Sequence, residues 1–229
     1  MNISRLARIA LVSALAFPAA AQAQIEQLQF GGVKFPAAQS IGSFKTGPYL
    51  ASRAPFTAAD VFDIYCIDLD HNAKSQWTAH YVTFAEAVGI YNVEATRQLG
   101  AGFDLGDLRT AAYLSNQFST TPQNNWASIH GQIWSLFSTN GAVSSYAAAA
   151  AVSKGIAGGD AAWDSYALIL DQNAFAANFD PRTANLNQAM ITDIGNTTIT
   201  VVTPEPSTYV LLGAGLLAIG FVSRRRRSV

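Results

Sequence analysis

Hydrophobic and polar residues alternate in short pieces over the first third of the chain, which is the pattern of half-buried β-strands. The alternation is clearest in residues 25–30, 40–45 and 77–84, while residues 61–69 are dense in β-branched and aromatic side chains. A polar loop, residues 70–76, separates residues 61–69 from residues 77–84. We therefore predict strands joined by turns, with residues 61–69 and 77–84 paired as a hairpin.

The spacing of apolar residues changes to a helical period after Gly89. Residues 105–118 repeat apolar side chains every three or four positions, and Asp104 is placed to cap the start of that helix. A second helix is predicted over residues 126–137, after a polar break. Its apolar residues fall on one stripe, which we expect to face the core: Ile129, Ile133, Trp134 and Phe137.

The part of the chain that follows mixes both patterns. Residues 145–152 include five consecutive alanines, a strong local preference for helix, and the glycines in residues 155–159 indicate a joint. We expect a further helix over residues 161–175 and a closing strand over residues 190–202. The predicted fold class is thus α+β, a single domain of strands with a central cluster of helices.

The C-terminal stretch contains two short motifs on either side of an apolar run, residues 209–222. The first motif is Pro204, Glu205, Pro206 and Ser207, and the second is Arg224, Arg225, Arg226 and Arg227. As a helix the run would span about 21 Å, less than the roughly 30 Å hydrocarbon core of a bilayer, a length typical of a buried core helix. Four adjacent cations instead favour a position on the cytoplasmic side of a membrane. We predict a short C-terminal membrane-anchor helix whose N-terminal side faces away from the cytoplasm.

The extended Pro-Glu-Pro element, the apolar run with its glycines and the arginine cluster, in this order, resemble the PEP-CTERM sorting signal of Gram-negative bacteria. The resemblance implies that a membrane-embedded exosortase recognises the tail, cleaves near Pro-Glu-Pro, and delivers the protein to the cell surface or extracellular matrix of a biofilm. Its implied partners are exosortase, the inner membrane before processing, and extracellular polysaccharide afterwards. The alternative is an ordinary C-terminal membrane helix that is never processed.

The N-terminus predicts export independently of the tail. Arg5 and Arg8 precede a short apolar run, residues 9–17, and Ala21 and Ala23 are the small residues that a signal peptidase reads. We predict cleavage after Ala23. The resulting organisation is a signal peptide over residues 1–23, an extracellular α+β domain over residues 24–203 and a sorting signal over residues 204–229.

The charge of the predicted domain differs from that of the whole chain. Residues 24–203 contain eight Lys and Arg against fourteen Asp and Glu, a net charge of −6, whereas the whole chain has −1. An acidic surface argues against nucleic acid as a partner, since phosphate binding needs cations. Cys66 is the only cysteine, so no intramolecular disulfide forms and the fold depends on its apolar core.

One constellation of residues points to chemistry in the domain. Tyr65-Cys66-Ile67-Asp68 and, some 60 residues later, Ile129-His130-Gly131-Gln132-Ile133-Trp134 resemble the thioester domains of bacterial surface adhesins. In that family the cysteine sulfur condenses with a glutamine amide to form an activated acyl group. The family glutamine lies four residues before the tryptophan, where this chain has His130. Gln132 is displaced by two residues, which rotates it about 200° around a helix.

Three interpretations of Cys66 remain open at this point. It is a buried core residue, a thiolate activated by His130, or half of a thioester with Gln132. No metal or cofactor is expected, because the calcium-like loop that begins at Asp68 lacks the glycine and the final glutamate of such loops. The function we expect is that of a non-enzymatic surface or matrix protein. The alternatives are a covalent adhesin and a secreted enzyme of unrecognised type.

Overall fold

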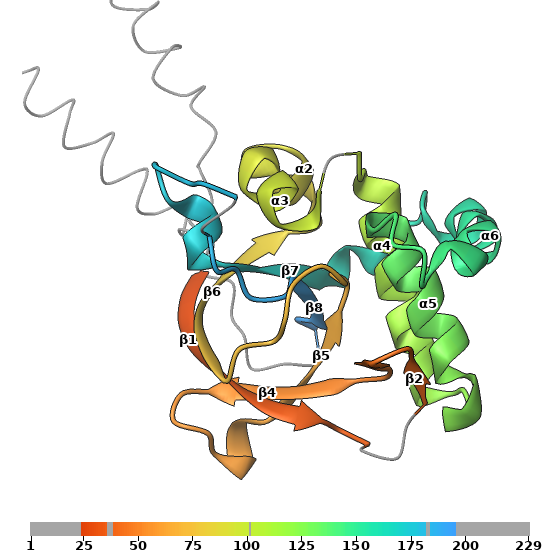
Figure 1. Ribbon diagram of the computed structural model, residues 1–229, viewed down its shortest axis with the longest axis horizontal. Coiled ribbons are helices and arrows are strands. Elements are labelled where there is room, and N and C mark those ends of the chain that lie inside the picture. Colours follow the sequence, from red (N-terminus) through yellow and green to blue (C-terminus); the bar gives the residue numbers. More distant parts are fainter. Residues whose placement is uncertain (1–23, 36–38, 101, 182–183, 196–229) are drawn as a thin grey trace, which may run out of the picture. The chain divides into compact units, whose positions relative to one another are not determined.

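The computed structural model describes residues 24–35, 39–100, 102–181 and 184–195. Six strands form a closed barrel in the order β1-β4-β5-β8-β7-β6, and every pair of neighbours is antiparallel (Figure 1). The barrel strands are β1 (Gln24–Val33), β4 (Tyr49–Arg53), β5 (Phe62–Cys66), β6 (Gln76–Thr83), β7 (Tyr166–Asp171) and β8 (Met190–Asp193). A separate small hairpin pairs β2 (Ser40–Ile41) with β3 (Phe44–Lys45).

The α-helices follow β6 and cover part of the barrel. They are α2 (Phe84–Val88), α3 (Asn92–Leu99), α4 (Leu105–Asn116), α5 (Trp126–Phe137) and α6 (Ala147–Ala157). Short 3-10 helices occur at η1 (Ala58–Asp60), η2 (Gln117–Ser119), η3 (Gln123–Asn125), η4 (Ser144–Tyr146), η5 (Ala161–Ser165) and η6 (Gln172–Phe175). Capping boxes begin two of the α-helices, at Thr83 for α2 and at Asp104 for α4.

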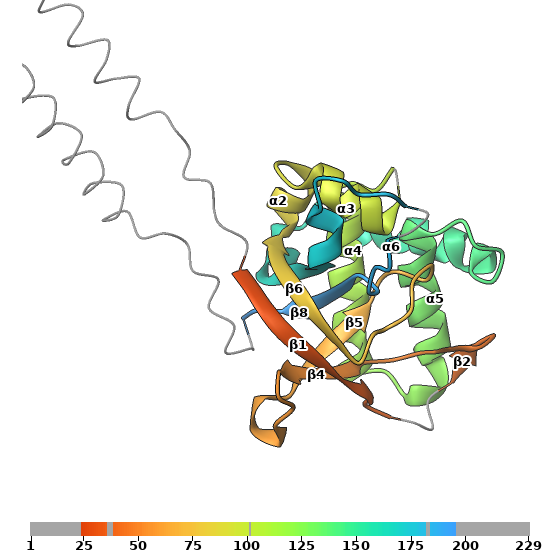
Figure 2. The same ribbon diagram turned by 60° about the vertical axis from the view of Figure 1, so that its left-hand side comes forward.

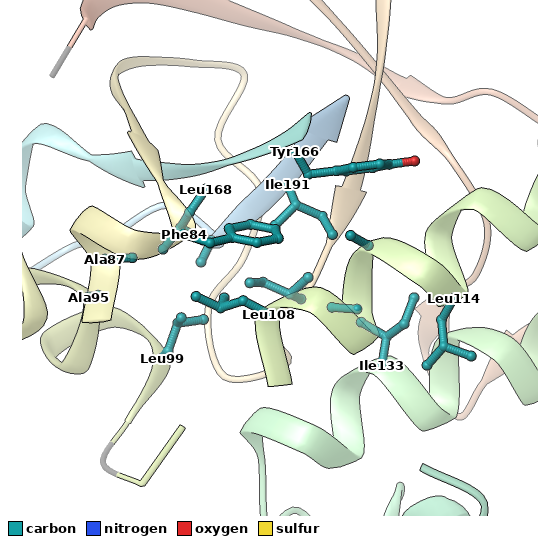
Figure 3. Packing of buried hydrophobic residues seen from close by; sticks show 14 of the residues in the cluster. Phe84, Ala87, Ala95, Leu99, Leu108, Leu114, Ile133, Tyr166, Leu168 and Ile191 are labelled. Carbon is teal, nitrogen blue, oxygen red and sulfur yellow. The ribbon is translucent and has the colours of Figure 1, made fainter. Parts of the chain in front are cut away.

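The alternation of side chains along the strands divides the core into two clusters. One lies inside the barrel and includes Leu28, Ile64 and Ile169. The other lies between the outer faces of β6, β7 and β8 and the helices, where Phe84, Leu108, Ile133, Leu168 and Ile191 point toward one another (Figure 3). Since β7 belongs to both clusters, all six of its residues are buried.

Much of the local prediction is confirmed. The strands predicted over residues 25–30, 61–69 and 77–84 correspond to β1, β5 and β6, and the helices predicted over residues 105–118 and 126–137 correspond to α4 with η2 and to α5. The stripe on α5 faces the core as expected: Ile129, Ile133 and Trp134 are buried and Phe137 is half-buried. Asp104 caps α4, where its carboxylate accepts a hydrogen bond from the Asp107 N–H.

The predicted hairpin of residues 61–69 with 77–84 is wrong. β5 pairs with β4 and β8, while β6 pairs with β1 and β7, so two strands separate them in the barrel. The polar loop between β5 and β6 is held instead by the segment before β8. There the Asp68 carboxylate accepts from the Ala189 N–H at 3.2 Å, and the Asn187 side chain accepts from the Lys74 N–H at 2.6 Å.

The predicted helix over residues 161–175 is also wrong, because its centre is β7. A strand that is buried on both faces does not alternate apolar and polar residues. Its continuous apolar run therefore has the same sequence pattern as a segment of a buried helix. The sequence did not predict α2 and α3, and the joint expected at residues 155–159 begins inside α6, which contains Gly155.

Of the predicted closing strand, residues 190–193 form β8, and the residues from 196 onward lie outside the described ranges. The signal peptide, the membrane-anchor run and both C-terminal motifs also lie outside them. Within the described residues, none of the helices has the length and hydropathy needed to cross a membrane.

Candidate functional site

Cys66 is the last residue of β5 and its side chain is completely buried inside the barrel. Its thiol donates a hydrogen bond to the Asp68 carbonyl, with the sulfur and oxygen 3.0 Å apart. The Trp134 indole N–H lies near the thiol without forming a well-aligned hydrogen bond. Burial raises the pKa of the Cys66 thiol far above its usual value, and the nearby Asp68 carboxylate acts in the same direction.

His130 lies beside this strand end and is also completely buried. Its Nε2 is 2.8 Å from the Cys66 carbonyl oxygen, and its Nδ1 accepts a hydrogen bond from the Gly47 N–H at 2.9 Å. Because Nδ1 accepts, the proton of the neutral ring is on Nε2, which donates to Cys66. The ring stacks on Trp134 with centroids 4.1 Å apart. Burial lowers the pKa of His130 to about 4, so the ring is neutral at physiological pH.

Gly47 makes this approach of the chain possible. Its φ is +103°, a conformation that other residues rarely adopt, and a side chain there would collide with the ring of Trp126. The loop before β4 can therefore pass close enough to α5 for the backbone of Gly47 to reach His130. His130 thus ties α5 both to the end of β5 and to the loop before β4.

The hydrogen bonds of His130 connect its imidazole to the backbone of Cys66 and not to the thiol. The imidazole contacts the backbone carbonyl of Cys66, and the thiol donates to another carbonyl, so the described contacts contain no hydrogen bond between ring and sulfur. A thiol with a raised pKa is a poor nucleophile, because the thiolate is the reactive form. The described contacts therefore give no support to a thiolate activated by His130.

Gln132 lies on a different face of α5, as the two-residue displacement predicts. Its carboxamide Nε2 donates to the Ser128 carbonyl at 3.2 Å, and its Oε1 accepts from the Ser153 hydroxyl at 2.9 Å. Ser153 belongs to α6, so Gln132 joins α5 to α6. His130, and not Gln132, has the position beside Cys66.

A second polar cluster was only partly visible in the sequence. The buried Asp68 carboxylate accepts from the Asp70 N–H at 2.8 Å, and its Oδ2 is 2.6 Å from Nδ1 of His71. This hydrogen bond raises the pKa of His71, although partial burial acts in the opposite direction. The loop that starts at Asp68 resembles the beginning of a calcium loop in sequence. In the structure the Asp68 carboxylate serves to hold the loop in place.

Asp171 is the centre of a buried network that no pattern in the sequence indicates. Its Oδ2 is 2.7 Å from the Lys74 ammonium and accepts from the Asn187 N–H at 2.7 Å, and its Oδ1 accepts from the Asn173 N–H. Gln98 completes the network by accepting from the Asp171 N–H and donating to the Asn187 carbonyl. In the sequence, Asp171 is a single carboxylate at the end of an apolar run. Because such a residue commonly ends a strand, its position does not indicate a buried network.

Potential metal ligands do not gather in the part of the chain that the structure describes. It contains no group of three His, Cys, Asp or Glu side chains able to hold a metal ion. A hollow of about 110 Å³ lies between the segment after α3 and the end of α5, and no titratable side chain lines it. Ligand pockets are usually several times larger, about 300–1,000 Å³.

The C-terminal tail matches a known sorting motif. The model of the PEP-CTERM protein-sorting motif matches residues 202–227. The chain therefore carries an exosortase sorting signal. Such a motif implies an exported protein that exosortase sorts to the cell surface. The match includes the Pro-Glu-Pro element and the arginine cluster, whose residues lie outside the described ranges. No curated protein and no solved structure matches the chain significantly.

Proposed function

We propose that this protein is a non-enzymatic component of the cell surface or of an extracellular polysaccharide matrix, delivered there by exosortase. The observation that carries the proposal is the sorting motif matched at residues 202–227. In this interpretation residues 1–23 direct export, residues 209–222 hold the precursor in the inner membrane, and cleavage near Glu205 frees residues 24–203.

The described part of the domain supports a non-enzymatic role. Its one thiol and its one fully buried imidazole are both used in structural hydrogen bonds. The net charge of −6 on residues 24–203 favours solubility and disfavours nucleic acid as a partner. No contact among the described residues favours a secreted enzyme.

The test compares a wild-type strain with one that lacks exosortase. Intact mass of protein recovered from the wild-type surface should correspond to a chain that begins at Gln24 and lacks all four arginines. Without exosortase, the membrane fraction should retain the tail. Glu205→Gln should also trap the precursor, whereas Glu94→Gln, a matched change in α3, should be sorted normally. Recovery of the full tail from the medium would contradict the proposal.

The same mass measurement tests the covalent adhesin. A thioester between Cys66 and a carboxamide releases ammonia, so a mass lower by one ammonia that Cys66→Ala abolishes would support the adhesin. We expect no such deficit, because Gln132 is hydrogen-bonded to Ser128 and Ser153 on another face of α5. His130→Gln places a carboxamide beside the thiol. If a thioester forms in that variant alone, the fold keeps the geometry that a thioester needs, while the wild-type chain lacks the carboxamide at position 130.

A further inference from the structure

The turn that connects α2 to α3 exposes an apolar surface without charge. We call residues 88–93, Val-Gly-Ile-Tyr-Asn-Val, the apolar turn. Ile90 is 61% exposed and Val93 is 58% exposed. The carboxylates nearest in the sequence are those of Glu86, which is used in the capping box of α2, and Glu94. The apolar turn thus offers two aliphatic side chains to a partner that accepts them without charge pairing.

The apolar turn lies at the end of the barrel from which both termini of the domain leave. β1 starts opposite Tyr81, and β8 ends opposite Tyr166, which begins β7. Thr83, the last residue of β6, pairs with Ala167, so α2 starts at this same end. Figure 2 shows α2 and α3 on the side of the barrel where β1 begins.

A row of rings connects the apolar turn to the first strand. Ile25, which is 57% exposed, pairs with His80. Phe175 stacks on His80 with centroids 3.9 Å apart, and Tyr91 of the apolar turn packs edge-on against Phe175 at 5.6 Å. Ile25 and the apolar turn therefore flank one partly apolar surface beside the exit of the chain.

The length of chain beyond this end limits how far the domain can move from the membrane. Thirteen residues, 196–208, separate Gly195 from the proposed anchor, and even a fully extended chain of that length spans no more than about 50 Å. A tether of this length keeps the exit end at high effective concentration near the bilayer, so a weak apolar contact suffices to hold it there.

We propose that Ile25 and the apolar turn dock on the outer surface of the phospholipid bilayer while the tail is anchored, so that the cleavage site is presented to exosortase. This inference rests on the proposed function, since it requires the anchor. The bound surface is uncharged at its centre and flanked by Glu94, so it binds through apolar insertion. Docking should therefore occur on zwitterionic phosphatidylcholine and should not weaken as salt is raised.

The chain contains a matched control on another surface. Val152 and Ile156 on α6 are 66% and 64% exposed, slightly more than the aliphatic residues of the apolar turn. Figures 1 and 2 both show α6 on the opposite side of the molecule from β1. If exposure alone caused membrane contact, the two surfaces would behave alike.

The buried Cys66 permits single-site labelling of the native protein. Ile90→Cys and Val152→Cys would each be labelled with an environment-sensitive fluorophore on protein exported by a strain without exosortase, with its tail retained. In phosphatidylcholine vesicles, spin-labelled lipids should quench the probe at position 90 several-fold more than the probe at position 152. Equal quenching at the two positions, or loss of quenching at position 90 in 1 M salt, would overturn the proposal.

A third label separates this proposal from the proposed function. Ala218→Cys reports whether the tail enters the bilayer. Quenching at 218 without preferential quenching at 90 would leave the anchor intact and disprove docking. Absence of quenching at 218 would contradict the anchor, and docking with it. A response at 90 that requires added exosortase would assign the surface to a protein partner and overturn the proposal for lipid.

Discussion

Two histidines bind the same short stretch at the end of β5, one at Cys66 and one at Asp68, and their surroundings give them opposite properties. His130 donates to the carbonyl of Cys66 within an apolar, completely buried site, which lowers its pKa to about 4. His71 bonds the carboxylate of Asp68 at a partly exposed edge, which raises its pKa. A carbonyl oxygen accepts a hydrogen bond from the neutral imidazole but carries no charge that would stabilise an imidazolium. A carboxylate is negatively charged and therefore favours the imidazolium.

The difference shows what each site contributes. The His130 site is a neutral junction of three segments whose stability depends on burial and on two complete hydrogen bonds. The His71 site pairs the buried Asp68 carboxylate with a partly exposed imidazole, and water at the imidazole screens part of the attraction. Tests at Trp134, His130, Cys66 and His71 can break or sharpen this contrast, and we expect their effects on the free energy of unfolding to decrease in that order.

Removing the ring on which His130 stacks should have the largest effect. Trp134→Ala deletes a buried indole and should lower the free energy of unfolding by about 3–5 kcal/mol. The half-buried Trp163 in η5 provides the control, and Trp163→Ala should cost clearly less. Urea unfolding followed by circular dichroism measures both. Equal losses would mean that Trp134 does not anchor α5 to the barrel.

Acid should destabilise the protein through His130. Between pH 6.5 and about pH 4, His130 is protonated in the unfolded state but stays neutral in the folded state. The free energy of unfolding therefore falls as the pH falls through this window. A shift of this size corresponds to about 3 kcal/mol. His130→Gln should remove this part of the pH dependence when unfolding is measured at each pH. An unchanged acid profile in that variant would show that His130 is not buried in its neutral form.

Changes at Cys66 should have smaller effects. Cys66→Ser places a hydroxyl where the sulfur is buried, and it should cost roughly 1–3 kcal/mol if the new group is poorly paired. Cys66→Ala avoids that penalty and should fold with a smaller loss. A thiol reagent should label the wild-type protein only after denaturation. Rapid labelling of the native protein would contradict the buried position of Cys66.

The smallest effect is expected at His71, with the opposite sign to His130. Because its folded pKa is raised, the Asp68–His71 pair stabilises the protein fully below about pH 6.5 and loses this contribution as pH rises through the folded pKa. His71→Gln should cost less than about 1 kcal/mol at pH 6, in the range of partly exposed pairs, and still less at pH 8.5. A greater loss of stability at pH 8.5 than at pH 6 would contradict a raised pKa of His71 in the folded protein.

The site could be predicted from the sequence only in part. Helical geometry was sufficient to place Gln132 and His130 on different faces of α5, and the structure confirms both positions. It could not predict that His130 bonds a carbonyl and not the sulfur, because this depends on where β5 ends against α5. The partner of Nδ1 is the N–H of Gly47, 83 residues earlier in the chain, and its approach requires a residue without a side chain beside the ring of Trp126.

Local patterns of residues were enough to predict the sorting signal, the cap of α4, the stripe of α5 and the existence of β1, β5 and β6. Local patterns could not predict that β7 and β8 separate β5 from β6, or that residues 166–171 are a strand. The physical reason is that strand pairing joins segments far apart in the chain. A six-residue apolar run is compatible with helix or strand until a barrel buries one of its faces and helices bury the other.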